Sequence, residues 1–177
     1  MSVPDADDRG MMMASLEREE RVRLAALRML EARPLSSTEL AERLAKRKLP
    51  KREIGIVVAR MVELGIVDDA RLAADVARRE ERYRPAGPAL LHDRLEHRGI
   101  EGTIADGAVS DVESRRPVRE RATELAQRAA EGLPAKLSDR QRWGRVLGAL
   151  ARRGFDEETA MEAAGQVLGT PPDALLE

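Results

Sequence analysis

The sequence predicts an all-α protein built from similar helical units. Composition is the first reason, because Ala, Leu, Arg and Glu favour helices and are abundant, whereas Phe, Tyr and Trp occur once each. The second reason is a sequence motif that occurs three times, as LAKRKLPKREI at 44–54, LEHRGIEGTI at 95–104 and LARRGFDEET at 150–159. The copies begin 51 and then 55 residues apart, and a recurrence at such an interval indicates an array of repeated units.

The second and third copies of this motif contain the signals of a helix C-terminus. In each, a basic helical turn is followed by a glycine, Gly99 or Gly154, and then by a large apolar residue, Ile100 or Phe155. Glycine reaches the left-handed conformation of a helix C-cap without strain. The polar run that follows then opens another helix.

Capping signals divide the first part of the chain into three helices. Pro34 ends the first helix, Ser36 and Glu39 form a capping box for the second, Pro50 suits the first turn of the third, and Gly65 stops it. The apolar positions expected to face the core of these helices are Leu24, Leu27, Met29, Leu30, Leu40, Leu44, Ile54, Val57, Val58, Met61 and Val62.

Similar signals continue to the end of the chain. Asp68 and Asp69 offer an N-cap, Pro117 begins a long helix, and Ser138 forms a second capping box with Gln141. The helix after Gly99 is the weakest prediction, because its glycines cost up to about 1 kcal/mol each relative to Ala. Core positions are expected at Ile104, Ala108, Val109, Val112, Trp143, Val146, Leu147, Leu150 and Phe155, and an N-cap at Asp156.

The charge distribution, together with the proline, glycine and helix-capping residues, gives the expected domain organisation. The segments are an acidic, disordered N-terminal tail at 1–20, three-helix repeats at 21–68, 69–114 and 115–168, and a C-terminal tail at 169–177. Disorder is expected up to about Ala14. Residues 1–20 hold six acids against two arginines, so the formal net charge of −1 hides a mildly basic body. Such a body permits a polyanionic partner without establishing one.

Several classes of function lack the residues they need. Without cysteine there are no disulfides or thiolate metal sites, and no apolar run approaches the roughly 20 residues that span a bilayer, so a cytoplasmic protein is expected. There is no phosphate-binding loop, and His92 and His97 are five residues apart, off one another's helical face. We therefore expect no metal, no cofactor, no catalytic residues and no enzymatic activity.

The order of several motifs resembles that of the RecX family of recombination regulators. The motifs are GIVDDARLA at 65–73, the basic helix after it, Gly87-Pro88, L-x-x-R-G-I ending at Ile100, and L-x-R-R-G-F ending at Phe155. The resemblance runs from about Arg23 to Leu168. Two positions depart from the family pattern: Leu72 stands where Phe is usual, and residues 33–36 replace a basic R-x-R-S turn.

The resemblance implies a fold, a partner and an activity. The fold would be an elongated, curved array of three tandem three-helix repeats. The partner would be the RecA filament on single-stranded DNA, whose ATPase, strand-exchange and co-protease activities a RecX-like protein suppresses, with consequences for DNA repair and the SOS response. Such a protein is not an enzyme, and we expect a cytoplasmic monomer. Whether it caps filament ends, coats the groove or displaces subunits is left open.

Clustered basic residues are the candidate contacts for the filament or for DNA phosphate. These candidates, with the one aromatic residue among them, are Arg78, Arg79, Arg82, Tyr83, Arg84, Arg115, Arg116, Arg119, Arg152 and Arg153. Arg121 belongs to the same stretch as Arg115 and Arg116. We interpret this stretch as the start of a helix. Positive charge is unfavourable there, so the presence of these arginines requires another explanation. The alternative is that these side chains form solvated faces or stabilise helix C-termini.

Two other classes of function fit parts of the sequence. Residues 24–69 are compatible with a helix-turn-helix transcriptional regulator, although no β-wing follows and the pattern recurs twice more. A structural helical scaffold fits the composition alone. Trp143 and Phe155 are expected in the core, which leaves almost no aromatic material for stacking on bases.

Overall fold

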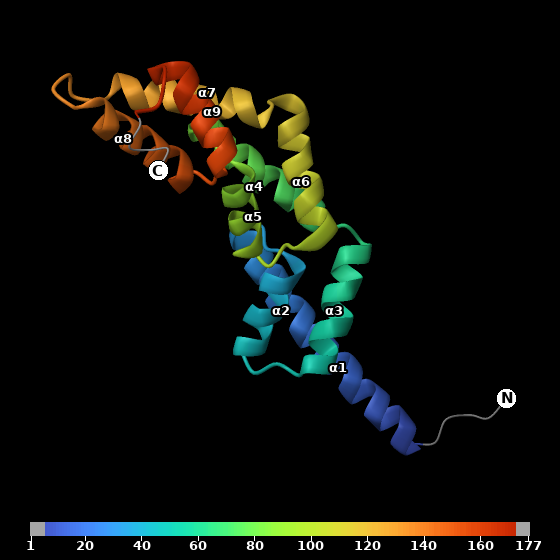
Figure 1. The fold of residues 1–177 in the computed structure, drawn as a ribbon. Coiled ribbons are helices and arrows are strands. Elements are labelled where there is room, and N and C mark those ends of the chain that lie inside the picture. The colour runs from blue at the N-terminus through green and yellow to red at the C-terminus, as the bar shows by residue number, and fades with distance from the viewer. Residues whose placement is uncertain (1–5, 173–177) are drawn as a thin grey trace. The chain divides into compact units, whose positions relative to one another are not determined.

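The computed structural model describes the backbone of residues 6–172 and the side chains from residue 10 onwards (Figure 1). These residues form nine α-helices and no strand, so the all-α prediction is confirmed. They divide into two compact units. Unit 1 holds the described residues up to Leu72 together with Arg98–Ile100, and unit 2 holds Ala73–His97 and the residues from Glu101 on. The expected repeat boundaries stay a prediction.

Unit 1 is a three-helix bundle of α1 (Ala6–Ala32), α2 (Ser37–Lys46) and α3 (Lys51–Glu63). The Ser36 side chain accepts a hydrogen bond from the Glu39 N–H, and the Glu39 side chain accepts one from the Ser36 N–H. This reciprocal pair satisfies two of the backbone donors that the start of a helix leaves open. The predicted capping box is therefore confirmed, and Pro50 lies immediately before α3 as expected.

The core of unit 1 is made of aliphatic side chains from all three helices. Its buried members are Val22, Ala26, Leu35, Leu40, Leu44, Ile54, Val57, Val58, Met61 and Val67. Two predicted core residues are wrong, because Leu24 is 43% exposed and Val62 is 46% exposed. At 100° per residue, Leu24 lies on the opposite side of α1 from its buried neighbours, so Val22 and Ala26 define the inward face.

The first helix begins earlier than the sequence analysis expected. It is helical from Ala6, so the expected disorder up to Ala14 is wrong for the described part of that segment. Met, Ala, Leu and Glu in these turns favour a helix. Arg18 also holds α1 against α3, since its Nε lies 3.1 Å from Oε1 of Glu53, a carboxylate that is nearly buried. Residues 1–5 of the expected tail lie outside the described residues.

Most of the remaining helices belong to unit 2. They are α4 (Asp69–Tyr83), whose residues from Ala73 are in this unit, α5 (Pro88–Glu96), α6 (Gly102–Arg115), α7 (Val118–Glu131), α8 (Asp139–Arg152) and α9 (Glu157–Leu168). Asp68 precedes α4 and accepts a hydrogen bond of 2.8 Å from the Arg71 N–H, which confirms the predicted N-cap. In α6 the expected core residue Ile104 is 38% exposed, whereas Ala105 is buried.

Helices α7, α8 and α9 pack into a second three-helix bundle. Its core includes Trp143 and Phe155, only 2% and 5% exposed, which confirms their predicted burial. The capping box of Ser138 with Gln141 and the N-cap at Asp156 are also confirmed. The other buried members are Ala122, Leu125, Ala126, Val146, Leu150, Ala160, Ala163 and Ala164. The alanines among them are small enough to let the helices approach closely. Residues 173–177 of the expected C-terminal tail lie outside the described part.

Candidate partner-binding surface

The end of α4 carries the densest group of predicted contact residues. Arg78, Arg79, Arg82, Tyr83 and Arg84 are all exposed, and Tyr83 is 78% exposed although aromatic. Arg78 pairs with Asp75 one turn earlier on the same helix. Arg79, Arg82 and Arg84 form no ion pair with any residue whose side chain the structure describes. Their guanidinium groups are therefore available to an external partner.

Glu80 joins this end of α4 to two other parts of unit 2. Its Oε1 lies 3.3 Å from Nε of Arg94 on α5, and its Oε2 lies 3.3 Å from Nη1 of Arg153, which follows α8. Arg153 also donates hydrogen bonds to the carbonyl oxygens of Pro85 at 3.0 Å and Arg84 at 2.7 Å. The Arg152–Arg153 cluster is thereby held beside the α4 cluster.

Glu81, the next residue, organises the link between α6 and α7. Its carboxylate lies 3.3 Å from Nη1 of Arg116 and 3.5 Å from Nη1 of Arg121. It also accepts a hydrogen bond of 2.6 Å from the Ala86 N–H. Arg116, Arg121 and Arg153 thus bind two acids near the end of α4 that the sequence analysis did not select.

Arg121 is the clearest exception among the basic residues of this region. Its side chain is fully buried, donates to the carbonyl oxygen of Arg116 at 2.9 Å and to Glu113 at 2.8 Å, and also bonds the Ala86 carbonyl. A buried guanidinium requires this degree of pairing, because an unpaired charge in the interior is costly. The hypothesis that Arg121 contributes to a basic surface is therefore wrong, and its role is to hold unit 2 together.

The positions of Arg115, Arg116 and Arg119 also differ from expectation. Arg115 lies in the last turn of α6 and pairs with Asp111 at 3.2 Å, so its charge is at a helix C-terminus, where it is favourable. Arg116 connects α6 to α7 and bonds Glu124 as well as Glu81. Neither residue opens a helix, which removes the argument that singled them out. Arg119 stays 68% exposed but pairs with Glu162 of α9 at 3.2 Å.

The predicted residues therefore fall into three groups. Arg116 and Arg153 make contacts within unit 2, and the side chain of Arg153 is only 18% exposed. Arg78, Arg115 and Arg119 are exposed but already paired. The residues that are exposed and make no described ion pair are Arg79, Arg82, Tyr83, Arg84 and Arg152, and we call these five the open group.

Arg153 has a counterpart in unit 1. Arg98 donates through Nη2 to the Pro34 carbonyl at 3.0 Å and to Glu39 at 2.9 Å, much as Arg153 binds the Pro85 carbonyl and Glu80. Pro34 and Pro85 are 51 residues apart, so the two proline carbonyls occupy equivalent positions, whereas Glu39 and Glu80 are 41 residues apart and do not. We call the two contacts the first arginine clasp, Arg98–Gly99 on residues 34–38, and the second arginine clasp, Arg153–Gly154 on residues 85–90.

The glycines of both clasps have the backbone conformation predicted from the sequence. Gly99 and Gly154 have φ of 64° and 77°, and a Cβ on Gly99 would lie 2.7 Å from Cβ of Thr38. The equivalent turn of the first repeat has Lys48 in this conformation, with φ of 58°. Sequence analysis missed this, because Lys gives no signal for a left-handed residue.

Burial and hydrogen bonding act in opposite directions on Glu39. Burial raises the pKa of the Glu39 carboxyl, but hydrogen bonds from Arg98, Arg33 and the Ser36 N–H outweigh it, so the pKa lies below its ordinary value. Glu39 is therefore held as a carboxylate between two arginines.

Among the described side chains no group of His, Asp and Glu is arranged to hold a metal ion. No described helix is long and apolar enough to cross a membrane.

Comparisons with known proteins assign the chain to a family. Residues 118–163 match the model of the third three-helix domain of RecX. The regulatory protein RecX of Chlorobaculum tepidum is 32% identical over 81% of this chain and 86% of its own length, and that of Streptomyces coelicolor is 30% identical over 84% and 78%. A crystal structure of RecX from Lactobacillus salivarius has the same fold, with a TM-score of 0.75 at 18% identity over 86% of this chain and 97% of that one. The chain belongs to the RecX family of regulatory proteins.

Proposed function

We propose that this protein regulates the RecA recombinase in the cytoplasm by binding the filament that RecA forms on single-stranded DNA. Binding would inhibit the ATPase, strand-exchange and co-protease activities of the filament. The observation that carries the proposal is the similarity to RecX regulatory proteins over 78% to 86% of their length, which extends well beyond the one matched domain.

The open group supports binding, rather than catalysis, as the mode of action. Four arginines without described acidic partners lie with an exposed tyrosine at the end of α4 and the end of α8. Arginine and tyrosine are the residues that most often contribute strongly to protein interfaces. We therefore assign the open group to the filament contact, with DNA reached through phosphate and not through base reading.

The network behind this surface gives it a defined shape. Arg153 bonds the backbone carbonyl of Arg84, and Glu80 holds both Arg153 and Arg94. Contacts of this kind fix the helix ends on which the open group stands, so less side-chain and backbone freedom is lost on binding. Arg116, Arg121 and Arg153 are accordingly assigned to positioning, and the exposed arginines to contact.

The primary test is the single-strand-dependent ATPase rate of the cognate RecA as this protein is titrated in. Inhibition at far fewer copies than RecA subunits would indicate that filament growth is blocked. Inhibition that requires a fixed fraction of the subunits would indicate that the groove is coated. An unchanged ATPase rate at every ratio would contradict the proposed function.

Charge reversal tests the assignment of the open group. The variant Arg79→Glu/Arg82→Glu/Arg152→Glu should need about tenfold more protein for half-inhibition, because reversed rim charges slow association and repel an acidic surface. The matched control is Arg21→Glu/Arg28→Glu/Arg43→Glu in unit 1, where all three arginines are exposed and have no described ion pair. Equal loss in both variants would mean that overall charge, and not the open group, controls binding.

A further inference from the structure

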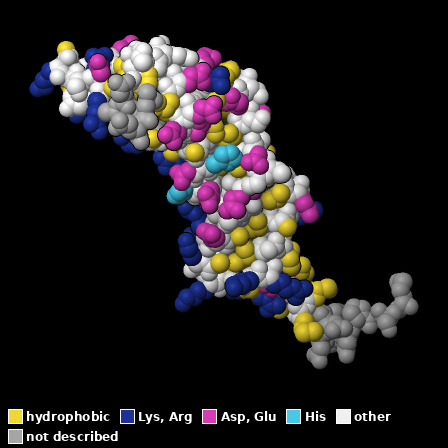
Figure 2. All heavy atoms as spheres, viewed as in Figure 1, with side chains coloured by type: hydrophobic (Ala, Val, Ile, Leu, Met, Phe, Trp, Pro, Cys, Tyr) yellow, Lys and Arg dark blue, Asp and Glu magenta, His cyan; other side chains and the backbone are white. Residues whose placement is uncertain are grey.

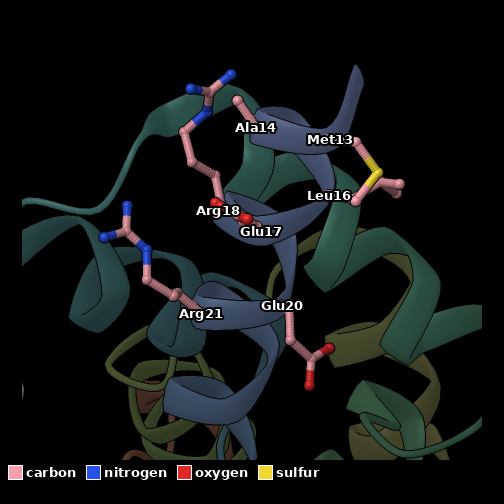
Figure 3. A pocket seen from close by; sticks show the side chains of 7 residues that line it. All are labelled: Met13, Ala14, Leu16, Glu17, Arg18, Glu20 and Arg21. Atoms are coloured by element: carbon pink, nitrogen blue, oxygen red, sulfur yellow. The ribbon is translucent and has the colours of Figure 1, made fainter. Parts of the chain in front are cut away.

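Residues 13–20 of α1 present a mixed acidic and apolar flank whose side chains are about half exposed. Met13 is 57% exposed and Leu16 is 52% exposed. Figure 3 shows that these two side chains lie on one flank of α1 with Glu20, while Arg18 and Arg21 point to the other, around a hollow whose described lining residues all belong to this helix. Positions 13, 16 and 20 recur at helical spacing, so they form one stripe.

A stripe of the opposite charge lies on the outward face of α3. Arg52, Ile56 and Ala59 are exposed at the same helical spacing, and Ile56 is 42% exposed. A Cβ added to Gly55 would meet nothing within 4 Å, so this face is open. Figure 2 shows apolar side chains along unit 1 with Lys and Arg near the end from which α1 emerges.

The charges near the two stripes are complementary. Residues 46–52 contain five basic residues and no acid, and none of the five pairs with a described acidic side chain. Residues 1–20 contain six acids against two arginines. Glu20 is bonded only to Arg23 on its own helix, where both side chains are about half exposed, so that contact is easily exchanged.

The spacing of the two stripes matches when the helices run antiparallel. Glu20 then lies over Arg52, Leu16 over Ile56, and Met13 over Ala59, because both stripes step by four residues and then by three. The carboxylate also lies near the N-terminus of α3, where the helix dipole favours negative charge. Within one chain this pairing is impossible, since α1 is a continuous helix already packed on the inner face of α3.

We propose that two copies of this chain associate by exchanging these contacts, with the α1 stripe of each copy on the α3 stripe of the other. Two identical contacts related by a twofold axis close the assembly as a dimer. This departs from the monomer expected from the sequence, where neither stripe was considered. The proposal does not depend on RecA.

Sedimentation velocity of the full chain tests the proposal, between about 1 and about 200 µM protein, the range of weak interfaces. The mass should rise from 19.6 kDa towards twice that value, and the dimer should weaken as salt is added. Leu16→Ser, Glu20→Arg and Arg52→Glu should each weaken the dimer about tenfold or more. The double variant Glu20→Arg/Arg52→Glu should restore it, and circular dichroism checks folding.

The control is Glu42→Arg, a reversal at an exposed acid on α2 without a described ion pair, which should leave the dimer unchanged. A monomer at every concentration would overturn the proposal, as would a dimer that tolerates Leu16→Ser or that the double variant fails to restore. If the protein is monomeric and Arg52→Glu instead lowers its affinity for a fluorescent oligothymidylate, the α3 stripe binds nucleic acid and the proposal is wrong.

Discussion

The arginine of each clasp binds a proline carbonyl and a glutamate, but the two clasps close their backbones differently. In the first clasp the Ser36 hydroxyl donates a hydrogen bond of 2.5 Å to the Arg98 carbonyl. In the second clasp the Gly87 N–H donates one of 2.7 Å to the Arg153 carbonyl. The same carbonyl is satisfied in one case by a side chain and in the other by backbone that approaches because no side chain is present. At this carbonyl, the first clasp is therefore sensitive to losing the Ser36 hydroxyl, and the second to gaining a side chain at Gly87.

The acidic residues of the two clasps, Glu39 and Glu80, also differ in the contacts that they make. Glu39 belongs to the capping box of α2 and binds Arg33 and Arg98, so one carboxylate stabilises a helix start and a clasp together. Glu80 lies on α4 and binds Arg94 and Arg153 without a capping role in the described structure. The carboxylate of Glu39 thus makes more contacts in the first clasp than the carboxylate of Glu80 makes in the second.

The largest effect should come from adding a methyl group to the second clasp. In Gly87→Ala the new Cβ would lie 2.1 Å from the Gly154 carbonyl oxygen, and its nearest neighbours are all backbone atoms. Backbone held by flanking helices cannot move aside cheaply, so we expect a loss of about 3 kcal/mol in the free energy of unfolding. Thermal unfolding should show this as a decrease in Tm of about 6 to 12 °C.

Gly107→Ala is the matched control for that substitution. Gly107 lies within α6, and a Cβ there would meet nothing within 4 Å. Ala should therefore stabilise the protein by up to about 1 kcal/mol. If both substitutions change Tm by the same amount, the close approach of Gly87 to Gly154 is not a structural constraint.

Removing one atom from the first clasp should have the next largest effect. Ser36→Ala removes both the cap of α2 and the donor to the partly buried Arg98 carbonyl, so we expect a loss of about 2 kcal/mol. Ser138→Ala removes a cap of the same geometry at an exposed position, and should cost about 0.5 to 1 kcal/mol. Urea denaturation of the two variants measures the difference, and equal losses would show that the contact to Arg98 contributes nothing.

The ionisable group of the first clasp should make unit 1 sensitive to acid. Because the folded-state pKa of Glu39 lies below its ordinary value of 4.5, its ionised form stabilises the fold above about pH 4.5, and this contribution is lost as pH falls through the lowered pKa. The stability difference between the unaltered protein and Glu39→Gln should therefore shrink below that pH. Glu42→Gln, at an exposed position on α2, should show no such change.

The sequence predicts the features that depend on near neighbours. The capping boxes at Ser36 and Ser138, and the left-handed glycines at 99 and 154, follow from residues within four positions of each other. The inward face of α1 was misassigned because Leu24 and Val22 are both apolar, and only packing against α2 and α3 distinguishes them.

The candidate surface was less predictable for a related reason. Arg116 and Arg153 are paired with Glu81 and Glu80, acids that lie 35 and 73 residues away in the sequence. The acids within the α4 cluster were visible in the sequence, but their partners were not. The cluster of charged residues at 78–84 therefore gave the location of the candidate surface, and the tertiary structure was needed to separate candidate contact residues from positioning residues.

The smallest expected effect concerns the turn at Lys48, a residue that has the left-handed conformation of Gly99 and Gly154 without being glycine. Lys48 adopts φ of 58° and is exposed. A left-handed conformation costs a residue with a Cβ about 1 to 2 kcal/mol, and glycine loses about 0.5 to 1 kcal/mol through its greater freedom in the unfolded chain. Lys48→Gly should therefore raise the free energy of unfolding by about 0.5 kcal/mol. A higher denaturant midpoint at an unchanged m-value would show this, whereas Lys46→Gly, inside α2, should lower it. A loss with Lys48→Gly would mean that the Lys48 side chain, and not its backbone, stabilises the turn.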